Sequence, residues 1–239
     1  MAPFRTESGA PVAAVTADEM REVDRVAVEE VGLGLLQMME NAGRTLAWHA
    51  RDAREAGGAG EVVVVAGNGG NGGGGLACAR HLTNRGVGVE VVLDRPPGEL
   101  TGAAAQQYGV LDAMGVPTGV GPDALAGRDP AVVVDALVGY GLGGALREPA
   151  RSIVEAVNGG PATVVSLDVP SGVDATTGEP LGAAVAPDRT VTLALPKTGL
   201  ADRPEGLVLA DISVPATVYR RLDIEYRNPF GERMWVDLV

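Results

Sequence analysis

Two aspartates follow valine-rich segments and precede glycine-containing turns. Asp135 follows residues 131–134, and Asp168 follows residues 163–167; the turns after them read ALVGYGLGG and VPSGVD. In open parallel sheets, ligands bind beyond the carboxyl ends of the strands. A single aspartate at such a place often only caps a helix. Two of them, each before a glycine turn, indicate a cation site, a general acid/base, or both.

A glycine-rich segment lies upstream of both acids. Residues 61–82 read EVVVVAGNGGNGGGGLACARHL, in which four valines lead into residues 67–75, all glycine or asparagine, and a helical pattern starts at Leu76. Ordering so much glycine has a large entropic cost, which makes sense if a ligand must approach the backbone closely. Because helix N-termini bind phosphate, the segment predicts a site for a nucleotide-like ligand. The plainer alternative is a flexible surface linker.

The same glycines also fit a dinucleotide-binding pattern. Gly67, Gly69 and Gly72 satisfy G-x-G-x-x-G, and Asp94 ends the next predicted strand. This interpretation would predict an NAD-dependent oxidoreductase. The pattern is weak evidence, because almost any glycine motif matches within so glycine-rich a segment, and it leaves Asp135 and Asp168 without a role.

Helical and strand patterns alternate along the chain. Thr16 and Glu19 form a capping box that opens a helix, which Gly32 and Gly34 end. Further helices are expected over residues 35–54, 76–85, 101–114 and 149–157, and strands over 61–66, 87–93, 131–134, 163–167, 190–195 and 207–212. This alternation predicts an α/β fold, a doubly wound, Rossmann-like three-layer α/β/α sandwich with a mostly parallel central sheet. We expect a lead-in over residues 1–15, one domain over 16–224 and a polar tail over 225–239.

The composition limits the classes of function. Of the 239 residues, 46% are hydrophobic but only 3% aromatic, so valine, leucine and alanine must build the core. A net charge of −12 argues against nucleic acid or an anionic membrane as a partner. Cys78 is the only cysteine, which excludes an intramolecular disulfide. With no signal-peptide pattern and no apolar run near the roughly 20 residues of a membrane span, we expect a cytoplasmic protein.

Several motifs, in order, resemble a known family, the NAD(P)H-hydrate epimerases, also called the YjeF N-terminal domain family. The resemblance spans residues 16–222. It rests on MENAGR at 39–44, GNGGGGL at 70–76 (NNGGDGL in the family), VDALVG at 134–139 (VDALFG), LREP at 146–149, DVPSGVD at 168–174 and ALPKTGL at 194–200 (APKPGL).

The resemblance implies an isomerase of metabolite repair. The family's substrates, NADHX and NADPHX, are hydrated forms of NADH and NADPH with a hydroxyl at C6 of the reduced nicotinamide ring, and the enzyme interconverts their R and S forms. This hydroxyl belongs to a hemiaminal. Once it is protonated, water can leave while the ring nitrogen stabilises the cation, and water can return on the other face. One carboxyl group can act as acid and then base, and the resemblance assigns this role to Asp168.

The family's other roles carry over to matching positions. Asn71, Asp135 and Ser171 match its potassium ligands, one K⁺ per subunit, and oxygen ligands of low total charge suit a monovalent cation. The implied partners are NADHX or NADPHX, a second copy in a homodimer, and a separate ATP- or ADP-dependent NAD(P)HX dehydratase. Besides Asp168, the implied substrate-binding residues are Gly70, Asn71, Gly72, Gly73, Gly74, Gly139, Tyr140, Gly141, Leu142, Gly143, Gly144 and Ala145.

The chain departs from the family's motifs in the glycine-rich segment. Gly70 and Gly74 stand where NNGGD has its first Asn and its Asp, and Tyr140 places a ring where relatives vary. The lost carboxylate leaves two alternatives to the epimerase open. One is the same fold recruited to another small-molecule isomerisation or hydration in specialised metabolism. The other is a non-catalytic nucleotide-binding module.

A few further side chains have two readings. Lys197 either offsets phosphate charge or is a solvated surface lysine. Asn41 is a better candidate than Glu40 for reaching a ligand, although both fit a structural role. His81 is expected to be a surface or packing residue, and Cys78 a small residue that fills the core.

Overall fold

The computed structural model describes residues 4–203 and 205–239. An eight-stranded sheet with the order β10-β9-β8-β7-β6-β3-β4-β5 forms its centre. All neighbouring strands are parallel except β9 and β10. The strands are β3 (Val62–Ala66), β4 (Val89–Leu93), β5 (Thr118–Val120), β6 (Val132–Ala136), β7 (Thr163–Leu167), β8 (Arg189–Leu193), β9 (Leu207–Ala210) and β10 (Trp235–Asp237).

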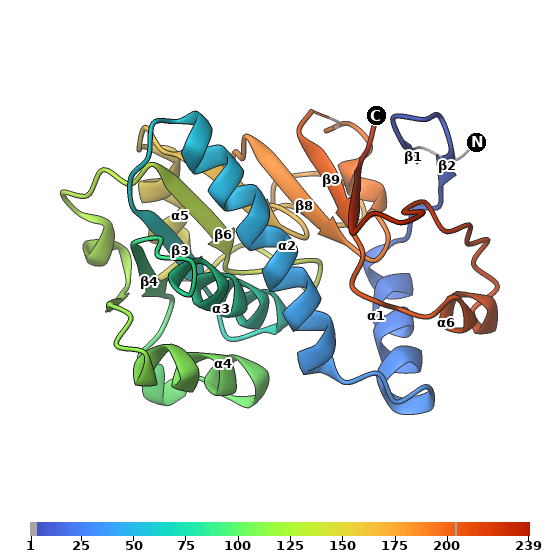
Figure 1. Cartoon of the computed structure of the whole chain (residues 1–239), viewed down its shortest axis with the longest axis horizontal. Helices are drawn as coiled ribbons and strands as arrows, with labels where there is room; N and C mark the ends of the chain where they lie inside the picture. Colours follow the sequence, from blue (N-terminus) through green and yellow to red (C-terminus); the bar gives the residue numbers. More distant parts are fainter. Residues whose placement is uncertain (1–3, 204) are drawn as a thin grey trace.

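Helices cover both faces of this sheet (Figure 1). On one face lie α2 (Leu35–Ala56), α3 (Gly70–Thr83) and α4 (Gly102–Ala113); on the other lies α5 (Ala150–Asn158). The valines of β3 explain the two layers, because Val62 and Val64 pack into the core with α2 and α3, whereas Val63 and Val65 pack against α5. The expected three-layer α/β/α fold with a mostly parallel sheet is therefore confirmed.

The N-terminal helix lies beside the C-terminal part of the chain. Thr16 caps α1 (Ala17–Arg25) through the expected capping box with Glu19. A π-helical turn, η1 (Val26–Glu30), continues α1, and both pack with α6 (Ala216–Arg221) in a cluster that includes Met20, Val23 and Tyr219. This packing fixes α1 close to the carboxyl ends of the strands (Figure 1).

The segments expected as a lead-in and a tail are packed parts of the fold where they are described. β1 (Phe4–Arg5) pairs with β2 (Pro11–Val12), and β10 is the antiparallel edge strand of the main sheet. Phe4, Val236 and Leu238 share one buried cluster, so the two ends of the chain support each other. Residues 1–3 lie outside the described part.

The expected start of the helix after the glycine segment is wrong. We expected it at residue 76, but α3 begins at Gly70, so most of the segment is helical. Glycine is a poor helix former. Close packing overrides this preference, because a Cβ at Gly72 would stand 1.7 Å from the carbonyl oxygen of Gly67. Similarly, β6 extends two residues past the expected strand to Ala136, so Asp135 lies inside the strand.

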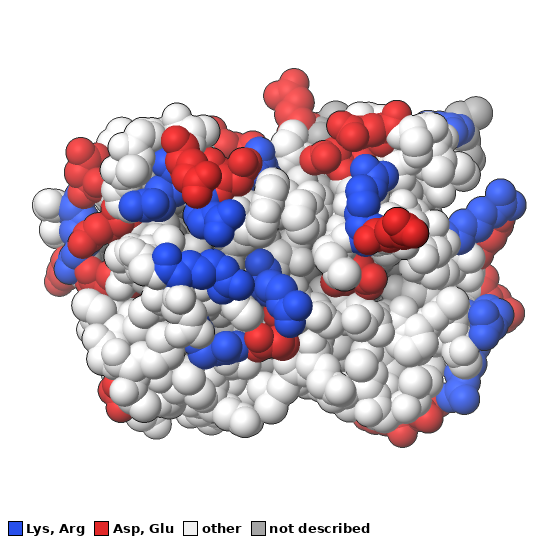
Figure 2. All heavy atoms as spheres, in the orientation of Figure 1, with Lys and Arg blue, Asp and Glu red and all other residues white. Residues whose placement is uncertain are grey.

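A 3₁₀ turn, η2 (Pro97–Glu99), follows β4. Other small elements were not expected from the sequence: β5 and the 3₁₀ turns η3 (Pro122–Leu125) and η4 (Thr198–Leu200). On the face shown in Figure 2, acidic and basic side chains are intermixed, and basic ones gather where α2 crosses the sheet. Among the described residues, no helix has the length and apolar character needed to span a bilayer.

Candidate active site

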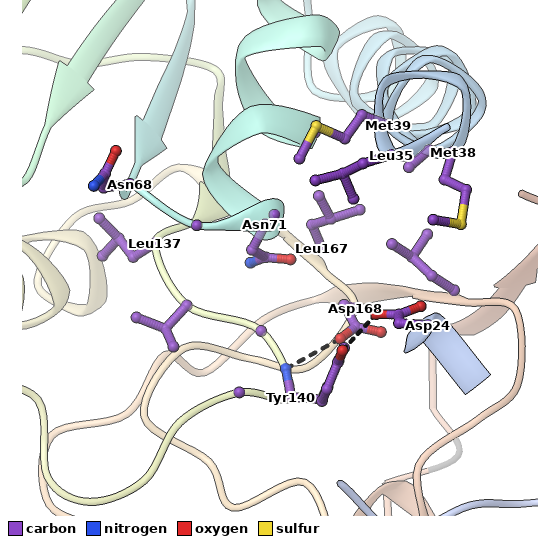
Figure 3. Close-up of a pocket in the computed structure, with 18 of the residues that line it drawn as sticks. Asp24, Leu35, Met38, Met39, Asn68, Asn71, Leu137, Tyr140, Leu167 and Asp168 are labelled. Atoms are coloured by element: carbon purple, nitrogen blue, oxygen red, sulfur yellow. Dashed lines mark hydrogen bonds between the residues drawn. The ribbon is translucent and has the colours of Figure 1, made fainter. Parts of the chain in front are cut away.

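A cavity of about 610 Å³ lies beyond the carboxyl ends of β3, β6 and β7. β3 is the first strand of this sheet along the chain. β4 and β5 lie on one side of β3, and β6 to β10 lie on the other. This is the switch point at which doubly wound folds bind ligands. The wall includes Asp24 of α1, apolar side chains of α2, the first turn of α3, the loop after β6 and Asp168 after β7 (Figure 3).

Asp168 has a left-handed backbone at the end of β7. Its φ is 68°, and its N–H donates to the carbonyl of Val191 over 2.8 Å. A non-glycine residue rarely adopts this conformation, and such strain is concentrated at functional sites. The side chain is almost fully buried, yet it borders the cavity. The turn therefore presents a carboxylate to a ligand while shielding it from bulk water.

Lys197 is the ionic partner of Asp168. Its Nζ pairs with Oδ1 of Asp168 and donates to the carbonyl of Leu193 over 2.9 Å. Lys197 is fully buried, so it is not a solvated surface lysine. An ion pair withdrawn from water depends on both partners, because either charge left alone is strongly destabilising. Lys197 therefore holds the carboxylate of Asp168 in place.

Tyr140 joins Asp168 to a second carboxyl group. Its backbone N–H donates to Oδ2 of Asp168 over 3.1 Å, and its hydroxyl donates to Oδ2 of Asp24 over 2.5 Å (Figure 3). Burial and the neighbouring charge of Asp24 raise the pKa of Tyr140. The hydroxyl therefore stays protonated as a hydrogen-bond donor at neutral pH.

Gly139 brings the loop after β6 against two polar side chains. A Cβ at this position would stand 2.9 Å from Oδ1 of Asn71 and 3.0 Å from Oδ2 of Asp168. Glycine is thus required for the amide of Asn71, the loop and the carboxylate of Asp168 to meet. Three segments that are far apart in the sequence contribute to this one point.

Some of the expected substrate-binding residues line the cavity. Those that line it are Gly70, Asn71, Gly74, Gly139, Tyr140, Gly141 and Asp168. The others do not border it: Gly72 and Gly73 are buried within α3, and Leu142, Gly143, Gly144 and Ala145 lie further along the loop. Contact of any of these residues with a substrate stays a prediction.

The residues expected to bind potassium surround a buried carboxylate. Asp135 is fully buried and accepts hydrogen bonds from the backbone and hydroxyl of Ser171, the hydroxyl of Ser166 and the backbone of Leu137. All these donors are neutral, and burial raises the pKa of Asp135. A cation nearby would compensate the charge of the ionised form.

Asn71 supports the same interpretation. Its Nδ2 is buried without a hydrogen-bond partner among the described residues. If the amide is turned over, its oxygen takes that place and becomes available to a cation, since the two amide orientations are distinguished only by their hydrogen bonds. The oxygen-rich residues therefore fit a hard cation. Within residues 4–203 and 205–239, no group of three or more His, Cys, Asp or Glu side chains is arranged to hold a metal ion.

Other singled-out residues lie away from the cavity or in its wall. Asn41 does not border the cavity; it donates to Ser213 and lines a smaller cavity of about 200 Å³. Glu40 pairs with Arg80 and His81, which gives all three a structural role. Asp94 does line the main cavity, where Arg95 binds its carboxylate.

The sequence matches one protein family over most of its length. Residues 35–199 match the family described as YjeF-related protein N-terminus. The chain belongs to this family. A YjeF-related protein of Dehalogenimonas lykanthroporepellens, named NAD(P)H-hydrate epimerase, is 42% identical over 95% of this chain and 93% of its own. One of Rhodopirellula baltica with the same name is 36% identical over 88% of each chain.

Longer and structurally known relatives extend this picture. A protein of Salinibacter ruber named bifunctional NAD(P)H-hydrate repair enzyme is 40% identical over 87% of this chain, which spans 42% of that protein's length. A solved structure of the yeast protein YNL200c superposes with a TM-score of 0.82, at 26% identity, over 95% of this chain and all of the yeast chain. The YjeF-related fold therefore covers nearly the whole chain.

Gly74 is the main departure from the YjeF-related motif, and its neighbour is Leu167. A Cβ at Gly74 would stand 2.8 Å from Cδ2 of Leu167. Both residues line the cavity. The side chain of Leu167 thus occupies the space into which a residue at position 74 would extend. At this point the cavity wall is apolar, where the family motif has a carboxylate.

Sequence reasoning missed Asp24. A signal for it existed, because Asp24 lies four residues after Met20 and next to Val23, on the edge of the buried stripe of an amphipathic helix. A carboxylate in that place must find a polar partner, and here it finds Tyr140.

Proposed function

We propose that this chain is an NAD(P)H-hydrate epimerase that interconverts the R and S forms of hydrated NADH and NADPH. One observation carries the proposal: Asp168 is buried at the switch-point cavity and paired with Lys197, in a chain 42% identical to a relative with that name over nearly its full length. The relatives support this isomerase. They do not support the two alternatives, another small-molecule reaction or a non-catalytic module.

Asp168 has the chemistry that the reaction requires. Loss of the C6 hydroxyl needs a proton delivered to its oxygen, and addition of water to the resulting cation needs a proton removed. A positioned carboxyl group can give a proton to, or take one from, an oxygen within its reach. Lys197 and the N–H of Tyr140 fix the two oxygens of Asp168, which limits their motion relative to a bound ring.

The rest of the cavity suits a dinucleotide. Leu35, Met38 and Met39 of α2 form an apolar side that a reduced nicotinamide ring can contact (Figure 3). Beside Met39, the first turn of α3 has backbone N–H groups without helical partners and borders the cavity at Gly70 and Asn71. Such groups bind phosphate without the need for a basic side chain, which matters in a chain of net charge −12.

The proposal includes one potassium ion held by Asn71, Asp135 and Ser171. Supporting it are the buried carboxylate with only neutral donors and the unpaired amide of Asn71. When bound, the ion would supply a positive charge that lets Asp135 remain ionised beside the loop after β6.

The proposal also includes partners that rest on the family resemblance. A separate ATP- or ADP-dependent NAD(P)HX dehydratase would consume one epimer. The Salinibacter ruber protein named a bifunctional repair enzyme supports this partner, because this chain spans only 42% of that protein's length. A homodimer and a cytoplasmic location are the remaining parts. Sedimentation velocity would test the dimer.

The direct test follows the two epimers by chromatography. Pure (R)-NADHX and pure (S)-NADHX are incubated separately with the protein in potassium buffer. The proposal expects both to reach the same ratio of epimers much faster than in buffer alone. Relaxation at the buffer rate from both sides would reject it.

A further inference from the structure

Asp24 differs from the other carboxyl groups of the cavity. Three acids line it: Asp24, Asp94 and Asp168. Asp94 is bound by Arg95 through two hydrogen bonds of 2.8 Å, and Asp168 is paired with Lys197. Among the described residues Asp24 has no basic partner; its contact is the hydroxyl of Tyr140. It is the acid of this wall whose charge is least compensated.

Burial in the cavity wall favours the protonated form of Asp24. Burial raises the pKa of Asp24; the hydrogen bond from Tyr140 and the charge of Lys197 offset part of the rise, and the charge of Asp168 adds to it. Arg21 lines the same cavity, but it is paired with Asp18. Asp24 and Asp168 are therefore two carboxyl groups in one cavity with different surroundings, an arrangement that separates acid from base roles.

Epimerisation at C6 makes different demands on the two faces of the ring. The hydroxyl leaves from one face and water adds to the other, so a single fixed carboxyl group can touch the reacting oxygen on one face only. Asp24 comes from α1 and Asp168 from the end of β7, and Tyr140 contacts both. We propose that Asp24 is a second catalytic residue, an inference that rests on the proposed function. Asp24 exchanges protons with the C6 oxygen on the face of the ring that Asp168 does not reach.

The proton balance closes over one conversion. The carboxylic acid of Asp24 gives its proton to the C6 hydroxyl, the C–O bond breaks with both electrons staying on oxygen, and the ring nitrogen lone pair forms the C=N bond. Water then bonds to C6 from the other face and loses a proton to Asp168. The epimer is formed with no net change in protons. The opposite epimer uses the same groups in reverse, and solvent exchange resets the pair.

The test compares Asp24→Asn with the wild-type protein in both directions. Asn keeps the size of the side chain and can still accept from Tyr140, but it cannot transfer the proton. We expect kcat to fall by about 100-fold or more, with KM changed by less than about threefold, and partial rescue by Asp24→Glu. Glu22→Gln, on the same helix with a side chain 54% exposed and outside the cavity wall, is the matched control and should keep the wild-type rate.

A second variant keeps the proposal testable if Asp24→Asn does not fold. Tyr140→Phe removes the hydroxyl that lowers the pKa of Asp24. The acid form of Asp24 should then persist to higher pH, and the alkaline limb of the plot of kcat against pH should move with it. If the alkaline limb does not move, or if Asp24→Asn keeps kcat within about threefold of wild type, the catalytic role of Asp24 is overturned and the proposed function stands. A wild-type protein without turnover would instead reject the proposed function, and the role of Asp24 with it.

Discussion

The ammonium group of Lys197 and the carboxylate of Asp168 form an ion pair that water barely reaches, with side-chain exposures of 1% and 5%. The pair connects the segment after β8 to the end of β7. Because both charges are withdrawn from water, neither can be removed without leaving the other uncompensated. This relationship links the stability of the fold to the group proposed to do the chemistry.

Replacing Lys197 should therefore harm both stability and catalysis. We expect Lys197→Met to lower the free energy of unfolding by about 3–5 kcal/mol, since the carboxylate of Asp168 is left buried and unpaired. Denaturant unfolding measures this change. Arg221→Met breaks an ion pair with Glu30 whose side chains are 46% and 39% exposed, and it should cost far less, because water screens exposed charges. Equal losses in the two variants would contradict the account.

The contact between Gly74 and Leu167 predicts coupled substitutions. Gly74→Asp should destabilise the protein by about 1–3 kcal/mol, because its Cβ meets Cδ2 of Leu167. In a double-mutant cycle, the loss for Gly74→Asp with Leu167→Ala should be smaller than the sum of the single losses by about 1 kcal/mol or more. Gly70→Asp is the control, since a Cβ there meets only Cε of Met39 at 3.8 Å. Additive losses would show that Leu167 does not fill the space.

Much of the architecture could be predicted because its signals are local. Valine runs located β3 and β6, and the capping box located the start of α1. The start of α3 at Gly70 could not be predicted, because glycine propensity disfavours helix and only the packing of Gly72 on Gly67 reverses that preference.

The parts of the site that lie within a recognisable sequence motif could be predicted. Asp168 and the loop at Gly139 were identified from their sequence context, and both border the cavity. The burial of Lys197 depends on a contact across 29 residues of chain, and the role of Asp24 depends on one across 116, so no local pattern could specify either.

His49 should make stability depend on pH. Burial and the charge of Arg189 lower its pKa from 6.5 to about 4. As pH falls from 6.5 toward 4, the unfolded chain takes up a proton that the folded protein does not, so stability falls in that window and is unaffected by this group above it. The pKa difference corresponds to about 3 kcal/mol. Denaturant unfolding at pH 7.5 and pH 4.5 should show a smaller loss in His49→Gln than in the wild type; the same loss would refute this cause.

Potassium should stabilise the folded protein if Asn71, Asp135 and Ser171 hold it. At a concentration ten times the Kd, binding adds about 1.4 kcal/mol. Thermal melting in KCl should therefore occur at a higher temperature than in NaCl at equal ionic strength. Asn71→Ala should reduce the difference, because it removes the buried amide that lacks a partner. Identical melting of the wild type in both salts would argue against the ion.

The most direct test of the central claim is the rate at which (R)-NADHX becomes the S epimer, measured in potassium buffer with an excess of an S-specific dehydratase. The wild-type protein should exceed the spontaneous rate. Asp168→Asn should lose about 100-fold or more of that activity, while Asp112→Asn, on the exposed side of α4, should keep it. A wild-type rate equal to the spontaneous one, or full activity in Asp168→Asn, would contradict the account.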